Sequence, residues 1–242
     1  MSIIMNVQFT VFSNNRIEPT PDNIGIILNK LNSLGKYTFL PSMINGQNID
    51  LAAGKMDPVS NISFVTLDQH VQIACMNERI DIVINGTQNN QSVPIEEHLE
   101  FARTVLDFLM EEYHTYSNRL AINISLLSGL IQKSIRETAI GKRMCSTFDY
   151  YQGKELDEWS SRVNTKQAIQ MAREELLNVI TDISVVTDNK SSKKRFMTHM
   201  DINTVFENNG YRFAANDLGP FIENVIGIVN TIKTNFEELD DE

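Results

Sequence analysis

Residues 194–217, KRFMTHMDINTVFENNGYRFAAND, hold the signals from which the fold is most readily inferred. From 195 to 206 the polar side chains His199, Asp201 and Asn203 alternate with a mainly apolar set. Successive side chains of a β-strand point to opposite faces of the sheet, so this alternation predicts a strand with one buried face and one polar face.

The next residues predict a reversal of the chain. Asn-Gly is the preferred pair in a tight two-residue hairpin turn, because both central residues of that turn need a positive φ. Asn209-Gly210 therefore predicts a hairpin in which the strand 195–206 returns through 211–215. Asn216 or Asp217 can then cap a final helix. The apolar stripe of that helix is Leu218, Phe221, Val225, Ile228, Val229, Ile232 and Phe236.

The first half of the chain has a similar order of signals. Alternation over 3–12 predicts a strand, and Thr20 followed by Pro21 predicts the start of a helix. Short alternating runs between Tyr37 and Gly86 predict an antiparallel meander with one buried face. Pro94 then opens a long amphipathic helix that runs to about residue 114.

The second half repeats this order loosely. Residues 119–126 alternate and predict a strand, and Asn164 or Thr165 is expected to cap a helix that ends near Ile180. Strands are expected near 181–188 and again at 195–206. Because both halves contain a meander followed by a long helix, a duplication is one interpretation, although no residue-by-residue repeat is visible.

The sequence therefore predicts an α+β protein of two halves, residues 1–117 and 118–242, that meet near residues 115–120. Each half is expected to be an antiparallel sheet packed against long amphipathic helices, and the second to end in a short acidic tail. Such halves would leave apolar faces to bury, so we expect a homo-oligomer with two-fold symmetry.

Composition limits the classes of function. The chain has 242 residues, 42% of them apolar and 21% charged, which is ordinary for a globular protein. It contains no apolar run of the roughly 20 residues that a membrane-spanning helix needs, and no secretory signal at its N-terminus. Cys75 and Cys145 lie far apart without Cys or His at metal-ligand spacing. We expect a cytoplasmic protein that contacts no membrane.

The formal net charge is −10, and residues 237–242 supply five of the acidic charges. This balance argues against binding nucleic acid over a broad surface, which requires a basic face. An acidic inhibitor that competes for the site of a nucleic-acid-binding protein is an alternative hypothesis, and it rests on net charge alone.

His199, Asp201 and Asn203 are the strongest candidates for a site, because positions two apart on a strand share a face. A zinc site needs at least three strong ligands, and Asn is a poor ligand for zinc. We therefore interpret the three residues as a solvated or partner-binding strand face. A metal-dependent hydrolase or nuclease-like enzyme centred on His199 and Asp201 is the alternative. The sequence predicts no catalytic residue, cofactor or metal.

Aromatic side chains define a second possible partner-binding segment. Tyr150, Tyr151 and Trp159 lie in an otherwise polar stretch, residues 149–161. Aromatic residues pinned to the core would have a structural role, whereas exposed ones are the kind that anchor protein interfaces.

Two segments resemble a known family. YSNRLAINISLL, residues 116–127, contains Arg119, Leu120 and Asn123 after a long helix, and FMTHMDINTVF contains Asp201 before a final helix that ends in Phe236. This pattern is similar to a sporadically distributed, uncharacterised bacterial family of α+β proteins of about this length. Asn203 replaces the second acid of its D-x-D-like pair. The resemblance implies an α+β fold of two halves and supplies no catalytic residues.

The leading hypothesis is a non-enzymatic cytoplasmic protein that acts through protein–protein contacts. A component of a bacterial defence, toxin–antitoxin or chaperone-like system fits this interpretation. The hypothesis is motivated by sheet edges that can accept a partner, by long amphipathic helices and by the absence of Gly-rich phosphate loops and nucleophile motifs.

Overall fold

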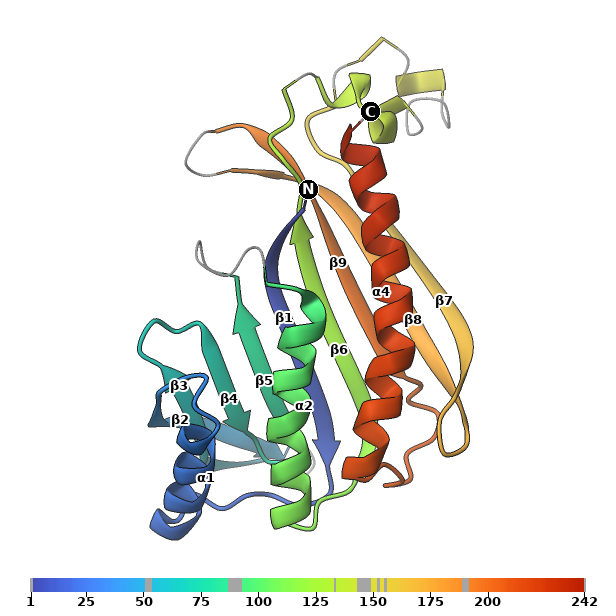
Figure 1. Cartoon of the computed structure of the whole chain (residues 1–242). Coiled ribbons are helices and arrows are strands. Elements are labelled where there is room, and N and C mark those ends of the chain that lie inside the picture. Colours follow the sequence, from blue (N-terminus) through green and yellow to red (C-terminus); the bar gives the residue numbers. More distant parts are fainter. Residues whose placement is uncertain are drawn as a thin grey trace.

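The computed structural model describes residues 2–50, 54–86, 93–132, 134–142, 149–151, 153–154, 156–188 and 192–241. These residues form one antiparallel sheet of nine strands in the order β2-β3-β4-β5-β1-β6-β9-β8-β7, shown in Figure 1. The strands are β1 (Ile3–Ser13), β2 (Phe39–Asp50), β3 (Lys55–Thr66), β4 (Val71–Cys75), β5 (Ile80–Asn85), β6 (Ser117–Leu127), β7 (Ser160–Gln170), β8 (Glu174–Thr187) and β9 (Lys194–Thr204).

Three long helices accompany the sheet: α1 (Pro21–Ser33), α2 (Ile95–Glu112) and α4 (Leu218–Asp241). Residues 139–142 are also helical, and short 3₁₀ turns occur at Ile135–Glu137, Asp149–Tyr151 and Ala215–Asp217. The N-cap of α1 is the predicted one, since the side chain of Thr20 accepts a hydrogen bond from the backbone N–H of Asn23. At the start of α4, the carboxylate of Asp217 accepts a hydrogen bond from the backbone N–H of Ala214.

The prediction of two halves with separate sheets is wrong. β1 and β6 come from the first and second half of the chain, and they pair along most of their length, with Val7 opposite Ile124 and Phe9 opposite Ile122. Each half of the chain does supply a contiguous half of the sheet, because β5 flanks β1 and β9 flanks β6. The two half-sheets are therefore joined at the centre into one sheet and do not pack as separate bodies.

The hydrophobic core lies between the sheet and its helices. Both α2 and α4 lie across the same face of the sheet in Figure 1. Phe9 at the centre of β1 is fully buried there, and its ring centroid is 5.8 Å from that of Phe221 on α4. Alternate residues of the central strands point into this core, as period-2 patterning requires.

The helix expected between residues 164 and 180 does not form, and the prediction was wrong. This segment is instead the hairpin of β7 and β8, with Asn164 opposite Ile180. β7 is an edge strand with almost every side chain exposed, so it lacks the alternation that marks a half-buried strand. Its Lys, Gln and Ala residues favour helices locally, and pairing with β8 overrides that weak preference.

The predicted hairpin at Asn209-Gly210 is also wrong. Gly210 is absent from the positive-φ residues of the described chain, and residues 205–214 form a loop that touches β6 only through a bridge between Ser117 and Phe213. Arg212 organises this loop: its guanidinium donates to the backbone carbonyls of Asn208 at 2.7 Å and Asn118 at 2.6 Å. It also forms a bidentate pair with the buried carboxylate of Glu175, at 3.0 Å for each bond.

Replacing Gly210 with valine should therefore change the free energy of unfolding by only about 0.5 kcal/mol, as for an ordinary surface substitution. A Cβ atom at this position would meet only the side-chain oxygen of Asn208, at 3.4 Å. Thermal or denaturant unfolding of Gly210→Val measures the change. A loss several times larger would restore the tight turn inferred from the sequence.

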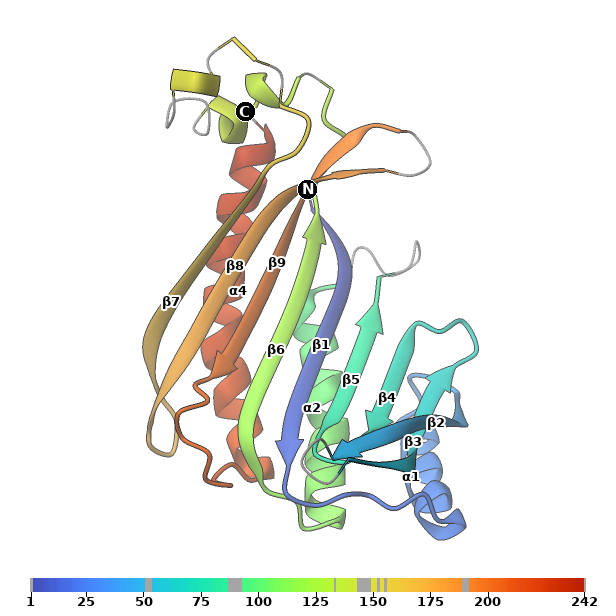
Figure 2. The same ribbon diagram turned by 180° about the vertical axis from the view of Figure 1, so that it is seen from behind.

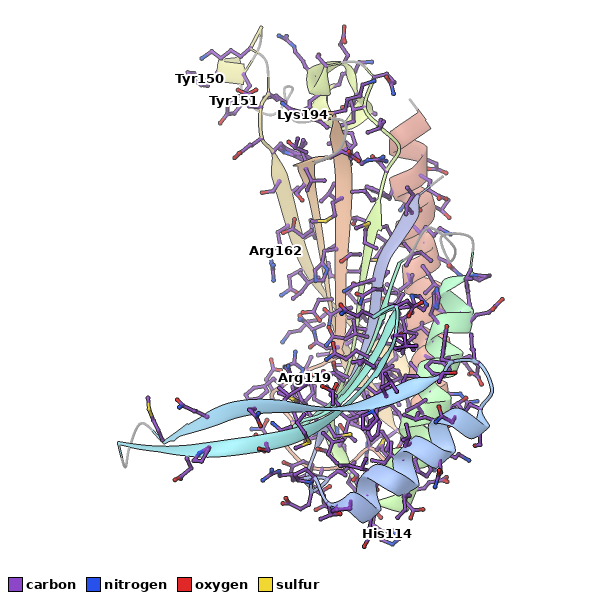
Figure 3. All side chains as sticks on the ribbon, turned by 90° about the vertical axis from the view of Figure 1, so that its left-hand side faces the viewer. His114, Arg119, Tyr150, Tyr151, Arg162 and Lys194 are labelled. Atoms are coloured by element: carbon purple, nitrogen blue, oxygen red, sulfur yellow. The ribbon has the colours of Figure 1, made fainter. Side chains whose placement is uncertain are left out.

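The second face of the sheet is not covered by the long helices. Figure 2 shows this uncovered face toward the viewer, with α2 and α4 behind the strands. β2 and β3, called the arm below, project from the sheet toward the side away from the helices (Figure 3). The uncovered face is thus bounded by the arm at one side. Among the described residues no helix is long and apolar enough to cross a membrane.

Candidate polar site on the uncovered sheet face

A row of polar side chains crosses three central strands of the uncovered face, β1, β6 and β9. Gln8 on β1 lies opposite Asn123 on β6, and Asn123 lies opposite Asp201 on β9. His199 is two residues from Asp201 and lies opposite Ser125. The strand register, and not proximity in sequence, brings these side chains together.

His199 and Asp201 are half-buried on this face, and Asn203 is buried. The side-chain amide of Asn203, which is 3% exposed, donates a hydrogen bond of 2.7 Å to the carboxylate of Asp201. Nδ1 of His199 is 3.0 Å from Oγ of Ser125. These contacts fix the orientations of His199 and Asp201 relative to the sheet.

A buried carboxylate lies next to this row. Asp81 on β5 is 5% exposed and accepts hydrogen bonds from Oγ1 of Thr10 at 2.7 Å and from the amide of Gln8 at 3.1 Å. The guanidinium of Arg79 pairs with its other oxygen at 2.8 Å. Asp81 and Arg79 therefore neutralise each other, and Thr10 and Gln8 are held in place by the pair.

Arg119 provides a second guanidinium on the same face. Its Cζ is 5.0 Å from the ring centroid of Phe12, a cation–π stack between neighbouring strands β6 and β1. Its Nε is buried and has no hydrogen-bond partner within the described part of the chain. Figure 3 places Arg119 close to the base of the arm.

Two separate hollows lie next to each other on this face. The central hollow, of about 430 Å³, is lined by β1, β6 and β9 residues that include Asn6, Asn123 and Asp201. The arm hollow, also about 430 Å³, lies between the arm and the β4–β5 turn, and its lining includes Asn61 and Asn77. Both hollows share Phe12 and Arg79 as lining residues, so we refer to them together as the trough.

The aromatic segment lies apart from the trough. Tyr150 is 71% exposed and its ring centroid is 5.3 Å from that of Tyr151, near the end of the molecule shown at the top of Figure 3. Trp159 is half-buried against the core and lines a separate hollow with the end of β8 and Lys194. None of the three aromatic residues lines the trough.

Sequence reasoning missed Gln8, Arg79, Asp81 and Arg119 as members of this site. Gln8 and Asp81 occupy the polar positions of alternating strands, which is the signal that could have identified them. Alternation assigns each side chain to a face but does not say which strands are neighbours, so four separate strands could not be joined into one site.

A metal site was sought among the side chains of the described residues. Within the described residues, no group of three or more His, Cys, Asp or Glu side chains could hold one. His70 and His98 lie on the helix side of the sheet, with ring centroids 6.3 Å apart and beside Tyr37. They do not join His199.

The buried imidazole of His98 predicts a pH-dependent stability. Burial, with smaller contributions from His70 and Lys36, lowers the pKa of His98 to about 4 from an ordinary value of 6.5. Between these values the unfolded chain binds a proton that the folded chain does not, so stability falls as the pH falls from 6.5 to 4. Each unit of pKa difference corresponds to about 1.4 kcal/mol, so the free energy of unfolding falls by roughly 3 kcal/mol over this pH range.

Urea unfolding of the protein and of His98→Gln between pH 7 and pH 4 measures this effect. The difference in free energy of unfolding between the two proteins should narrow as the pH falls, because only the parent chain carries the His98 contribution. Parallel pH profiles would contradict the prediction.

No known family has a sequence model that matches the chain, and no curated protein matches it in sequence. The resemblance to the sporadically distributed bacterial family stays a prediction. What the site can do is therefore inferred from its geometry.

Proposed function

We propose that this protein is a non-enzymatic binding protein that acts through protein–protein contacts, and that the uncovered sheet face is the contact surface. The observation that carries the proposal is the trough itself. Small-molecule sites are usually enclosed and mainly apolar, with only a few polar groups. The central hollow is open and is lined mostly by amide, guanidinium, imidazole and carboxylate side chains.

The sheet edges support the same proposal. β2 and β7 are the terminal strands of the sheet, and β7 is exposed along nearly all of its eleven residues. An edge strand presents unpaired backbone N–H and C=O groups to which another chain can add. The arm and β7 thus flank the uncovered face with two further surfaces for a protein partner.

A protein of this kind fits a bacterial defence, toxin–antitoxin or chaperone-like system, and a cytoplasmic location fits its cysteine usage. A homo-oligomer is one form that the contacts can take. No specific observation favours the hydrolase or nuclease-like alternative, and the acidic-inhibitor alternative still rests on net charge alone.

Site-specific photo-crosslinking in the native host tests the proposal. A photoreactive phenylalanine derivative replaces Gln72 on β4 or Asn164 on β7, which lie on the uncovered face and line neither hollow of the trough. Matched controls carry it at Glu223 or Thr234, which are exposed on α4. Mass spectrometry identifies each adduct and distinguishes another protein from a second copy of this chain.

We expect discrete protein adducts from the two sheet positions and none from the two helix positions. Adducts of equal yield at all four positions, or at none, contradict the proposed contact surface. Turnover of p-nitrophenyl phosphate or p-nitrophenyl acetate that His199→Gln abolishes would establish the enzyme alternative instead.

A further inference from the structure

Among the described residues, four buried side-chain polar atoms without partners lie in the trough, and others of this kind lie elsewhere, among them Oη of Tyr113 and Nε1 of Trp159. Within the part of the chain that the structure describes, the side-chain oxygens of Asn6, Asn61 and Asn77 are buried without a hydrogen-bond partner, as is Nε of Arg119. Asn6 and Arg119 line the central hollow, and Asn61 and Asn77 line the arm hollow. Most buried polar groups in native proteins are paired, so a group of unpaired ones on a single surface calls for a functional explanation.

These four atoms specify a particular chemistry. Three are amide oxygens that accept hydrogen bonds, and the fourth belongs to a guanidinium that donates to an anion. These atoms have almost no accessible surface, so a ligand reaches them only when neighbouring side chains move aside. Such a ligand must present several N–H or O–H donors together with a carboxylate or phosphate. An extended polypeptide provides N–H donors at regular intervals, and a Glu or Asp side chain provides the anion.

Arg119 is ready to receive such an anion. Its stack on Phe12 holds the guanidinium plane, and it forms no ion pair with any acidic residue in the described ranges. Arg79, in contrast, is already paired with Asp81. An arginine that is oriented in advance loses less conformational freedom when it binds a carboxylate through two parallel hydrogen bonds.

The opposite end of the central hollow has the opposite charge. Asp201 lies across from Asn123, which is four residues from Arg119 along β6, a separation of about 13 Å at 3.3 Å per residue. A ligand with its anion at Arg119 and a donor or cation at Asp201 must therefore span several residues of extended chain. A single amino acid is too short to reach both groups.

The distribution of charge permits an acidic ligand on this face. α2 carries six acidic side chains against one arginine, and α4 carries five against one lysine. These two helices account for nine of the ten net negative charges of the chain, and both lie behind the sheet. The sheet and the arm are nearly neutral as a whole, and the trough is lined by Glu78 and Asp201 as well as by Arg79 and Arg119. An acidic segment must therefore place its carboxylate at Arg119 and keep it away from these two acids.

Nucleic acid satisfies the trough less well. Its affinity comes from several phosphates that each meet a cation, whereas the trough offers one arginine without an acidic partner and three carbonyl-type acceptors. Amide oxygens repel phosphate oxygens, and they accept hydrogen bonds from backbone N–H groups.

We propose that the trough binds an extended acidic segment of a partner protein, with a Glu or Asp carboxylate of that segment on Arg119. This inference rests on the proposed function and names the chemistry of the partner. Asn6, Asn61 and Asn77 accept hydrogen bonds from the backbone of the segment, and Asp201 faces a donor or a basic side chain further along it.

Binding of synthetic peptides tests the proposal. The probe is a nonapeptide of alternating threonine and serine with glutamate at its centre, and two matched peptides carry glutamine or lysine there. The Nε–H resonance of Arg119 and the side-chain amide resonances of Asn6 and Asn61 are followed by NMR as each peptide is added. Inorganic phosphate and a single-stranded oligonucleotide are titrated in parallel.

We expect the glutamate peptide to shift these resonances and to bind at least about tenfold more tightly than the glutamine peptide, as for a hydrogen bond to a charged group. Arg119→Gln should weaken its binding by a similar factor, and Arg119→Lys should restore part of the affinity. Arg162→Gln is the matched control, because Arg162 lies on the same face at the edge strand, outside the trough (Figure 3). Arg162→Gln should change the dissociation constant of the glutamate peptide by no more than roughly twofold, because Arg162 is an exposed charge.

Several results would overturn the inference. The glutamate peptide could fail to bind at its solubility limit, or could bind Arg119→Gln as well as the parent chain. Tighter binding of phosphate or of the oligonucleotide at Arg119 would assign the trough to phosphate instead. If the photo-crosslinked protein adducts persist unchanged in Arg119→Gln, the uncovered face is still a protein contact surface. Its partner then does not bind through an acidic side chain at Arg119. The melting temperatures of the parent chain and of Arg119→Gln are compared as a control. Equal values show that a loss of peptide binding is not caused by unfolding of the variant.

Discussion

Replacing Phe9 with alanine is expected to lower the free energy of unfolding by roughly 3–5 kcal/mol, the usual cost of removing a large aromatic side chain from a packed core. Phe9 is fully buried in the middle of the sheet, and its ring packs against Phe221 of α4. The substitution therefore leaves a cavity between the central strand and the helix that covers it. Urea unfolding measures the loss.

Phe12→Ala is the matched control, because Phe12 lies three residues further along the same strand on the opposite face. It is half-buried and its ring contacts the guanidinium of Arg119. We expect its cost to be less than half that of Phe9→Ala, with binding at the trough reduced in its place. Equal losses in the free energy of unfolding for Phe9→Ala and Phe12→Ala would mean that both faces of β1 are covered. That result would contradict a sheet with one uncovered face.

The sequence was sufficient to assign residues to the two faces of the central strands. The alternation over 3–12 places Val7 and Phe9 on one face and Gln8 on the other, and in the structure Val7 and Phe9 are buried while Gln8 lines the trough. Such an assignment needs only the alternation of side chains along a strand, which is a local property. The start of α1 at Thr20 and Pro21 was equally local and was confirmed.

Which strands are neighbours could not be predicted from alternation. β1 and β6 are separated by more than a hundred residues and pair at the centre of the sheet, with Gln8 opposite Asn123. Alternation fixes the face of each residue, and any antiparallel partner with a matching apolar face satisfies it. The two-half prediction assumed that each meander closes on itself, so it missed the pairing that makes one sheet.

The same limit applies to the candidate site. His199 and Asp201 are recognisable because they share one strand, whereas Asp81 and Arg119 belong to two strands that no local pattern predicts to lie close together. The trough depends on β1, β6 and β9, on the β4–β5 turn and on the arm, and its unpaired amide oxygens become recognisable only after burial is known. A site built on the strands of one sheet is therefore visible in the sequence only in part.

The second large effect is expected at Arg212, whose replacement with alanine should destabilise the protein by roughly 3–5 kcal/mol. Both Arg212 and Glu175 are buried, with side chains 8% and 6% exposed. Burial alone would raise the pKa of Glu175, but hydrogen bonds from Arg212 and Arg173 outweigh it and hold that pKa below its ordinary value. Removing Arg212 leaves a buried carboxylate with only the half-exposed Arg173 for a partner.

Arg173→Ala and Gly210→Val are the controls for Arg212→Ala. Arg173 binds the same carboxylate but its side chain is 48% exposed, so its loss should cost about 1 kcal/mol or less. Gly210 lies in the same loop, and its replacement is expected to be nearly neutral. If the loop were the tight hairpin that Asn209-Gly210 suggests, the order would be reversed, with Gly210→Val costly and Arg212→Ala mild. Unfolding of the three variants in urea thus decides whether this loop is held by its turn residues or by the guanidinium of Arg212, and the structure assigns it to Arg212.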